Sequence, residues 1–285
     1  MFNYPQIDPV AISLGPINIH WYAISYLLGF YVCWRVLLSL RDRQRQSWRR
    51  EQISDLLSYG VFGVILGGRF GYVLFYGFDN FLQDPISLLK IWQGGMSFHG
   101  GLLGVIAAVA WYAHRNQRTF LEVMDFVAPG VPLALGLGRI GNFINAELPG
   151  RITDVPWSLI YPGEMVGRHP SSLYQMTLEG PVLFAIVYAL ALRHQRVGMV
   201  SGGFLIAYSG LRFFSEFFRL PDSHLGFVAW GWATQGQLLC IPMLLLGIGV
   251  VIYAKPAIPP TALQGSGKGR SQKNAQKNAQ KKRKS

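Results

Sequence analysis

Apolar runs long enough to cross a lipid bilayer recur along most of this 285-residue chain. A helix needs about 20 apolar residues to cross the hydrocarbon core, whereas a soluble protein shows shorter amphipathic stretches. The charged fraction of 14% is well below the roughly 25% of an average soluble domain. We therefore expect an all-α integral membrane protein with about seven transmembrane helices, at 19–38, 56–75, 96–113, 132–144, 181–192, 202–218 and 238–254.

Lysine and arginine are distributed unevenly between the two sides of these predicted spans. One side receives 18 of the 26, in 41–50, 115–118, 193–196 and 255–285, and the other receives only Lys90, Arg151, Arg168 and Arg219. Cytoplasmic loops carry the excess of basic residues, so the C-terminus is expected in the cytoplasm, and an odd number of spans places the N-terminus outside. No groove of basic and aromatic residues accompanies the net charge of +12, so we expect no nucleic acid partner.

The same pattern divides the chain into two parts. Residues 1–254 are expected to form a polytopic transmembrane domain, and 255–285, rich in Pro, Gly, Gln and Lys, are expected to be a disordered basic cytoplasmic tail. Between the fourth and fifth spans, 146–172 are polar and contain four prolines, which predicts an irregular region outside the membrane, on the side of the N-terminus. No cluster of metal-ligating residues is visible, so we expect no metal and no cofactor.

The most informative stretch is 138–150, at the outer end of the fourth predicted span. Arg139 and Asn142 are three residues apart and share a helix face, and together they are suited to hold a phosphate. An arginine within a span requires a partner, either a carboxylate such as Glu147 or an anionic ligand. The alternative is a buried ion pair that only locks helices together.

A second pair, Arg212 and Glu216, lies near the outer end of the sixth predicted span. The spacing of four residues puts both side chains on one helix face, where an intrahelical salt bridge is the simplest interpretation. Two arginines at the depth of the outer leaflet nevertheless favour a shared lipid phosphate, because a guanidinium binds phosphate oxygens bidentately.

Three further residues have two possible roles each. His99 opens the third predicted span between glycines that leave its ring accessible, although a lone histidine is more often structural. Tyr22, in the sequence His-Trp-Tyr at the start of the first span, is either an interfacial anchor or a functional residue. Arg69, within the second span, is ambiguous between packing and ligand binding.

Taken together, these motifs resemble the prolipoprotein diacylglyceryl transferase family over essentially the whole ordered chain. The stretch 138–150 matches the family pattern at every defining position, and the segments around Tyr22, His99, His169 and Arg212 match in order. The resemblance implies importance for nine residues: Tyr22, His99, Arg139, Asn142, Asn145, Glu147, Gly150, Arg212 and Glu216. One departure is visible, since the family commonly reads His-Pro-x-Gln-Leu-Tyr-Glu where this chain has Ser172 and Gln175, so we assign neither of these a catalytic role.

By this resemblance, the chain is expected to move a diacylglyceryl group from phosphatidylglycerol to the lipobox cysteine of a preprolipoprotein, in the bacterial inner membrane with the active site toward the periplasmic half. Arg139 and Arg212 would stabilise the departing phosphate, with Glu147 and Glu216 orienting them. His99 is the first candidate for the base and Tyr22 a weaker one. Asn142, Asn145 and Gly150 are expected to help bind the lipid.

The residues alone leave two other classes of protein open. A transporter or channel also carries intramembrane arginine and histidine, although its polar residues should occur at several depths rather than toward one side. A structural scaffold would need the Arg139 motif only for packing. Without the family resemblance, enzyme, transporter and scaffold are about equally supported.

Overall fold

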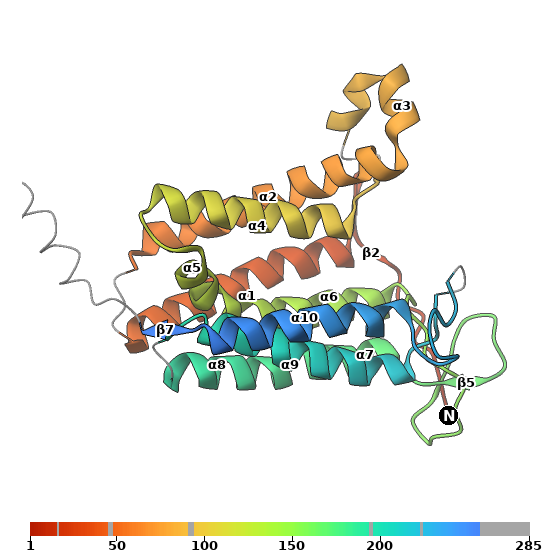
Figure 1. Cartoon of the computed structure of the whole chain (residues 1–285). Helices are drawn as coiled ribbons and strands as arrows, with labels where there is room; N and C mark the ends of the chain where they lie inside the picture. Colours follow the sequence, from red (N-terminus) through yellow and green to blue (C-terminus); the bar gives the residue numbers. More distant parts are fainter. Residues whose placement is uncertain (16, 45–47, 91–93, 194–195, 223–224, 257–285) are drawn as a thin grey trace, which may run out of the picture.

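The computed structural model describes residues 1–256 except 16, 45–47, 91–93, 194–195 and 223–224 (Figure 1). Within these residues, five helical stretches are long and apolar enough to cross a membrane, namely Trp21–Arg43, Arg50–Tyr76, Phe120–Ile144, Ser171–Arg193 and Gln235–Ile252. The protein is therefore a mostly helical membrane protein, as the sequence predicts. The expected tail lies outside the described residues from 257 onward.

The helices have the following bounds: α1 (Trp21–Gln44), α2 (Arg50–Tyr76), α3 (Phe78–Gln83), η1 (Pro85–Leu89), α4 (Phe98–Arg115), α5 (Phe120–Val127), η3 (Ala128–Gly130), α6 (Val131–Ile144), α7 (Ser171–Thr177), η4 (Leu178–Val182), α8 (Leu183–Arg193), α9 (Met199–Ser215), η5 (Glu216–Phe218) and α10 (Gln235–Ile252). The strands are β1 (Phe2–Asn3), β2 (Val10–Leu14), β3 (Ile17–His20), β4 (Leu159–Ile160), β5 (Gly167–Arg168), β6 (Arg196–Val197) and β7 (Lys255–Pro256).

The predicted fourth and fifth spans were too short, because prolines interrupt their apolar patterns. Pro129 and Pro132 lie where α5 passes through the 3-10 turn η3 into α6, and the helical stretch therefore begins at Phe120. Pro181 lies in η4, a π-helical turn between α7 and α8, so that this stretch begins at Ser171. Proline removes one backbone donor, and local 3-10 or π geometry accommodates the loss without ending the helix.

A bundle of helices forms the main body. α1 packs along α6, α6 packs against α7 and η4, and α9 packs against α8 and α10. The buried core includes Leu37, Ile53, Val123, Leu183 and Val187, each with essentially no exposed surface. Leu37 lies near the end of α1 and Ile53 near the start of α2, so this core includes the end of the bundle where α1 finishes.

α2 and α4 form a separate pair that lies beside α1 (Figure 1). Their backbones approach closely at glycines: a Cβ built on Gly104 would lie 2.1 Å from the carbonyl oxygen of Gly63, and one on Gly100 2.3 Å from that of Gly67. Small residues allow such backbone contact between membrane helices, where dispersion rather than water exclusion drives association. The glycines thus fix α4 on α2.

Short strands occur where the sequence predicts only helices and irregular segments. β1, β4 and β5 form a three-stranded sheet, in which β1 pairs parallel to β4, and β2 and β3 form a hairpin that leads into α1. Leu159 of β4 and the neighbouring Tyr4 and Tyr161 are buried and pack against Phe143 of α6. The region 146–172 is therefore mostly irregular, as expected, but the sheet ties it to the N-terminus and to the end of α6.

Arg69 of α2 has a packing role. Its buried guanidinium donates hydrogen bonds to the carbonyl oxygens of Ser87, Leu88, Gly94 and Gly95. These carbonyls belong to the segment that includes α3 and η1, which projects from the end of α2 (Figure 1). Of the two roles that the sequence leaves open for Arg69, the structure shows the structural one.

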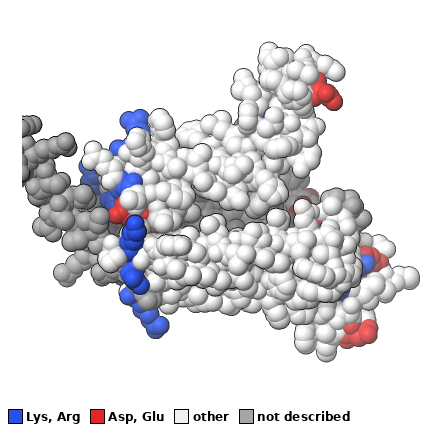
Figure 2. Space-filling view, viewed as in Figure 1, with Lys and Arg blue, Asp and Glu red and all other residues white. Residues whose placement is uncertain are grey.

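Basic residues gather at one end of the molecule. Figure 2 shows Lys and Arg at the end where α1 finishes and α4 finishes, and a broad middle band of the same face without charged residues. Arg41 and Arg43 lie in the last turn of α1, Arg115 in that of α4 and Arg193 in that of α8. The N-terminus and the region 146–172 lie at the opposite end (Figure 1).

Candidate functional site

The centre of the candidate site is Glu179, a fully buried carboxylate in η4. Arg139 of α6 approaches its Oε2 atom with Nε at 3.0 Å and Nη2 at 2.9 Å, and Arg212 of α9 approaches its Oε1 atom with Nη1 at 3.4 Å. The two arginines that the sequence singles out are thus brought together by one carboxylate. Each arginine is largely buried, with 20% of the Arg139 side chain and 12% of the Arg212 side chain exposed.

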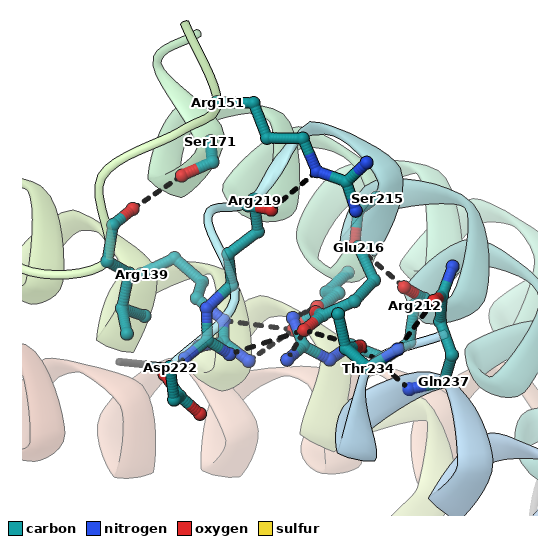
Figure 3. Close-up of polar contacts among 12 residues, drawn as sticks. Arg139, Arg151, Ser171, Arg212, Ser215, Glu216, Arg219, Asp222, Thr234 and Gln237 are labelled. Carbon is teal, nitrogen blue, oxygen red and sulfur yellow. Dashed lines mark hydrogen bonds and ion pairs between the residues drawn. The ribbon is translucent and has the colours of Figure 1, made fainter. Parts of the chain in front are cut away.

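A second carboxylate extends this cluster toward α10. Glu216 lies 2.9 Å from Arg212, as the spacing of four residues predicts, and 3.7 Å from Arg219. Thr234, which caps α10, donates a hydrogen bond of 3.1 Å to Glu216 Oε1. Arg139, Arg212, Glu216 and Arg219 point toward one another in Figure 3, and an exposed aspartate, Asp222, pairs with Arg219 at the outer edge.

The predicted partner of Arg139 was wrong. Glu147 accepts hydrogen bonds from Asn142 Nδ2 at 2.7 Å and Asn145 Nδ2 at 3.1 Å, while Glu179 pairs with Arg139. The backbone turns sharply here, because Ala146 and its second neighbour Leu148 both have positive φ angles. Glu147 therefore holds the amides at the end of α6 and orients neither arginine.

Sequence reasoning missed Glu179. It stands in the segment Thr-Leu-Glu-Gly-Pro, and a predicted span that begins at Pro181 leaves it just outside the membrane helix. A signal was present nonetheless, since a lone carboxylate within an apolar stretch that extends back to Ser171 requires a buried cation. Gly136 and Gly180 permit the close crossing, because a Cβ on Gly136 would lie 2.9 Å from the Gly180 Cα.

Tyr22 lies against the helix that carries Arg139. A Cβ built on Gly141 would lie 2.6 Å from a carbon of the Tyr22 ring, so the glycine makes room for the ring. The neighbouring Tyr26 packs edge-on against Tyr22 with ring centroids 5.1 Å apart, and Tyr26 interacts electrostatically with Arg139. The structure therefore places Tyr22 beside the arginine cluster, next to a second tyrosine that the sequence did not single out.

His99 lies on the other helix pair. It occupies the first turn of α4, where its exposed ring makes an edge-on contact with Phe98. α4 packs on α2, whereas Arg139 and Arg212 belong to helices of the main bundle. His99 and the two arginines therefore lie in different parts of the fold. The exposed ring of His99 confirms the prediction that its flanking glycines leave the ring accessible.

Gly150 is required for close backbone packing in the outer region. A Cβ at this position would lie 2.1 Å from the carbonyl oxygen of His169, and Gly150 also forms an isolated β-bridge with Arg219. His169 is itself fixed, because Trp157 Nε1 donates to the Tyr174 hydroxyl at 2.6 Å and this hydroxyl lies 3.2 Å from His169 Nδ1. Burial lowers the pKa of His169 below its ordinary value.

This arrangement is suited to bind an anion at the end of the bundle opposite the basic end. Three guanidinium groups converge on two buried carboxylates, and each guanidinium has five N–H donors, more than these pairs use. The carboxylates hold the guanidiniums in place before a ligand arrives, which is the preorganisation that makes electrostatic stabilisation effective in a poorly hydrated site.

Similarity to known proteins extends over most of the chain. Residues 9–253 match the family model described as prolipoprotein diacylglyceryl transferase. A protein of Ectopseudomonas mendocina named phosphatidylglycerol–prolipoprotein diacylglyceryl transferase is 52% identical over 256 residues, covering 89% of this chain and 96% of that protein. Proteins of the same name from Chromohalobacter salexigens and Pseudomonas aeruginosa are 52% and 49% identical, covering 90% and 89% of this chain and 95% and 96% of their own lengths. The chain therefore belongs to the prolipoprotein diacylglyceryl transferase family.

Proposed function

We propose that this chain transfers the diacylglyceryl group of phosphatidylglycerol to the lipobox cysteine of a preprolipoprotein, the first step of bacterial lipoprotein maturation. The names of its relatives support both substrates. The observation that carries the proposal is the buried carboxylate Glu179 between Arg139 and Arg212, because it holds two guanidiniums where an anionic lipid phosphate has to be bound.

In the reaction, the cysteine sulfur attacks the diacylglyceryl carbon that is bonded to the phosphate. A carbon–sulfur bond forms, the carbon–oxygen bond to the phosphate breaks, and glycerol 1-phosphate leaves with the electron pair of the broken bond. Negative charge therefore grows on the phosphate in the transition state. Arg139 and Arg212 lower the barrier by interacting with this charge more strongly than with the uncleaved lipid.

The thiol proton needs an acceptor, since a free cysteine has a pKa near 8.5 and the thiolate is the nucleophile. His99 is the first candidate for the base, because histidine is the commonest general base in enzymes and its ring is accessible here. The position of Tyr22 against α6 supports a role for its hydroxyl in hydrogen bonding to substrate. If His99 is the base, the peptide cysteine has to lie between the α2–α4 pair and the main bundle.

We also propose the finer membrane arrangement. α4 and α9, with 18 and 17 residues, would add two crossings to the five long apolar stretches and give seven spans. The basic end would face the cytoplasm, and the N-terminus and the arginine cluster would lie at the periplasmic side of the inner membrane. Cysteine labelling at 14 and 115 in intact cells tests this orientation, since only position 14 should react with an impermeant maleimide.

Purified protein in detergent, with phosphatidylglycerol and a synthetic lipobox peptide, tests the reaction. Peptide mass and glycerol 1-phosphate release are followed for wild type, Arg139→Ala and His99→Ala, with Arg41→Ala at the basic end as a matched control. We expect a diacylglyceryl mass gain that Arg139→Ala abolishes and Arg41→Ala leaves unchanged. Folded wild type that gives no mass gain with both substrates would overturn the proposal and favour the transporter alternative.

A further inference from the structure

Gln175 of α7 is a fully buried residue with a side-chain amide. Among the described residues, neither its Nε2 nor its Oε1 atom forms a hydrogen bond. Gln237, the other fully buried glutamine among them, differs because its Oε1 accepts a hydrogen bond of 3.0 Å from the backbone of Thr234. A buried amide without any partner is costly, and native proteins satisfy nearly all such groups. This observation points to a polar group that binds there.

The position of Gln175 identifies the neighbourhood of that group. Gln175 is four residues before Glu179, the partner of Arg139, and three residues after Ser172, so all three share a face of the helical stretch. The Ser172 hydroxyl donates a hydrogen bond of 3.1 Å to the carbonyl oxygen of Glu147 at the end of α6. Along the bundle axis, Gln175 thus lies between Arg139 and the end of α6.

The helix α6 runs alongside this face. A Cβ built on Gly136 would lie 3.3 Å from the carbonyl oxygen of Met176, the residue after Gln175. One helical turn, about 5.4 Å, separates Gln175 from Glu179 along the axis. A phosphate held by Arg139 would therefore carry its substituent within reach of the Gln175 amide.

A primary amide offers two donors and one acceptor. The glycerol headgroup of phosphatidylglycerol carries two hydroxyls, each of which donates and accepts, so it can satisfy both ends of the amide. An ethanolamine headgroup has a cationic donor but no acceptor and would leave Nε2 unpartnered. Inorganic phosphate fills the arginine site without reaching the amide.

We propose that Gln175 binds the glycerol hydroxyls of the phosphatidylglycerol headgroup and so selects this lipid among phospholipids. The proposal rests on the proposed function of the chain, because it assumes a phosphatidylglycerol phosphate at Arg139. It makes Gln175 a specificity residue, distinct from the arginines that act on the phosphate.

The test uses Gln175→Met, which keeps the length of the side chain and removes the amide. Binding of glycerol 1-phosphate, ethanolamine phosphate and inorganic phosphate to the full-length protein is measured by thermal shift. Wild type should bind glycerol 1-phosphate roughly tenfold more tightly than either of the others, and the variant should lose this preference. In the transfer assay, the variant should raise KM for phosphatidylglycerol about tenfold with kcat nearly unchanged.

Thr177→Val is the matched control. Thr177 is exposed two residues away, and its hydroxyl already bonds to the carbonyl oxygen of Leu173, so the change should affect neither preference nor KM. Gln175→Ala replaces the methionine variant if that variant does not fold. Wild type without a preference for glycerol 1-phosphate, or a variant that retains it, would overturn the proposal. If wild type prefers glycerol 1-phosphate but transfers no diacylglyceryl group, only the proposed function is contradicted.

Discussion

Replacing Glu179 by glutamine tests whether one carboxylate holds the site together. The substitution keeps the size of the side chain but removes the negative charge that Arg139 and Arg212 share at 2.9 and 3.4 Å. Glu179 has no exposed surface, so water cannot take over its role. Two largely buried guanidiniums then lose a counterion at the same time.

The magnitude follows from the burial of this carboxylate. Removing one partner of a buried ion pair typically costs about 3–5 kcal/mol, because an uncompensated charge is left behind. Glu216 still pairs with Arg212 at 2.9 Å, which favours the lower end of this range. For a domain of this size, about 3 kcal/mol corresponds to a fall in melting temperature of roughly 6–12 °C.

Thermal unfolding of the detergent-solubilised protein, followed by tryptophan fluorescence, measures the effect of Glu179→Gln. Asp42→Asn serves as the control, since Asp42 pairs with Arg41 but its side chain is 63% exposed, and exposed pairs contribute about 0–1 kcal/mol. Saturating phosphatidylglycerol should recover part of the loss, because the lipid phosphate replaces the missing charge. An unchanged melting temperature together with unchanged transfer would refute the reasoning.

Two other changes test the packing and the outer region. Gly104→Ala places a Cβ 2.1 Å from the Gly63 carbonyl oxygen and should destabilise the protein by about 1–3 kcal/mol. Gly249→Ala is the control, because no atom lies within 4 Å of its added Cβ, and it should be neutral. Equal melting temperatures of the two variants would contradict the close contact of α2 and α4. Because burial lowers the pKa of His169, the unfolded chain takes up a proton first as pH falls below about 6.5, so stability should be constant above this pH and decrease below it. Unfolding midpoints between pH 8 and pH 5 measure this, and His169→Gln, which still allows a hydrogen bond to Tyr174, should reduce the slope.

Local spacing was sufficient to predict the interactions that lie within one helix. The apolar runs predicted a membrane protein, and the spacing of four residues predicted the pair Arg212 and Glu216, because neighbouring turns of a helix are adjacent in any fold. The arginines also meet at one end of the bundle, as their positions at the ends of two predicted spans suggested.

Interactions between helices were not predictable in the same way. Arg139 pairs with Glu179, 40 residues away, and no local pattern distinguishes this carboxylate from Glu147, which lies closer in the sequence. The choice depends on how α6 crosses η4 at Gly136 and Gly180. Pro181 also caused the wrong start of the fifth predicted span, because a π-helical turn at this proline continues a helix that begins at Ser171.

The charge of the cluster bears on which anionic lipid it binds. Arg139, Arg212 and Arg219 carry three positive charges, and Glu179, Glu216 and the more exposed Asp222 carry three negative ones, so the cluster is close to neutral. Glu179→Gln removes one negative charge and leaves the cluster with a net positive charge. The substitution should therefore shift binding toward phosphatidic acid, whose phosphate carries more than one negative charge near neutral pH. Competition between phosphatidic acid and phosphatidylglycerol measures the shift, and an unchanged ratio would show that geometry, rather than charge balance, selects the lipid.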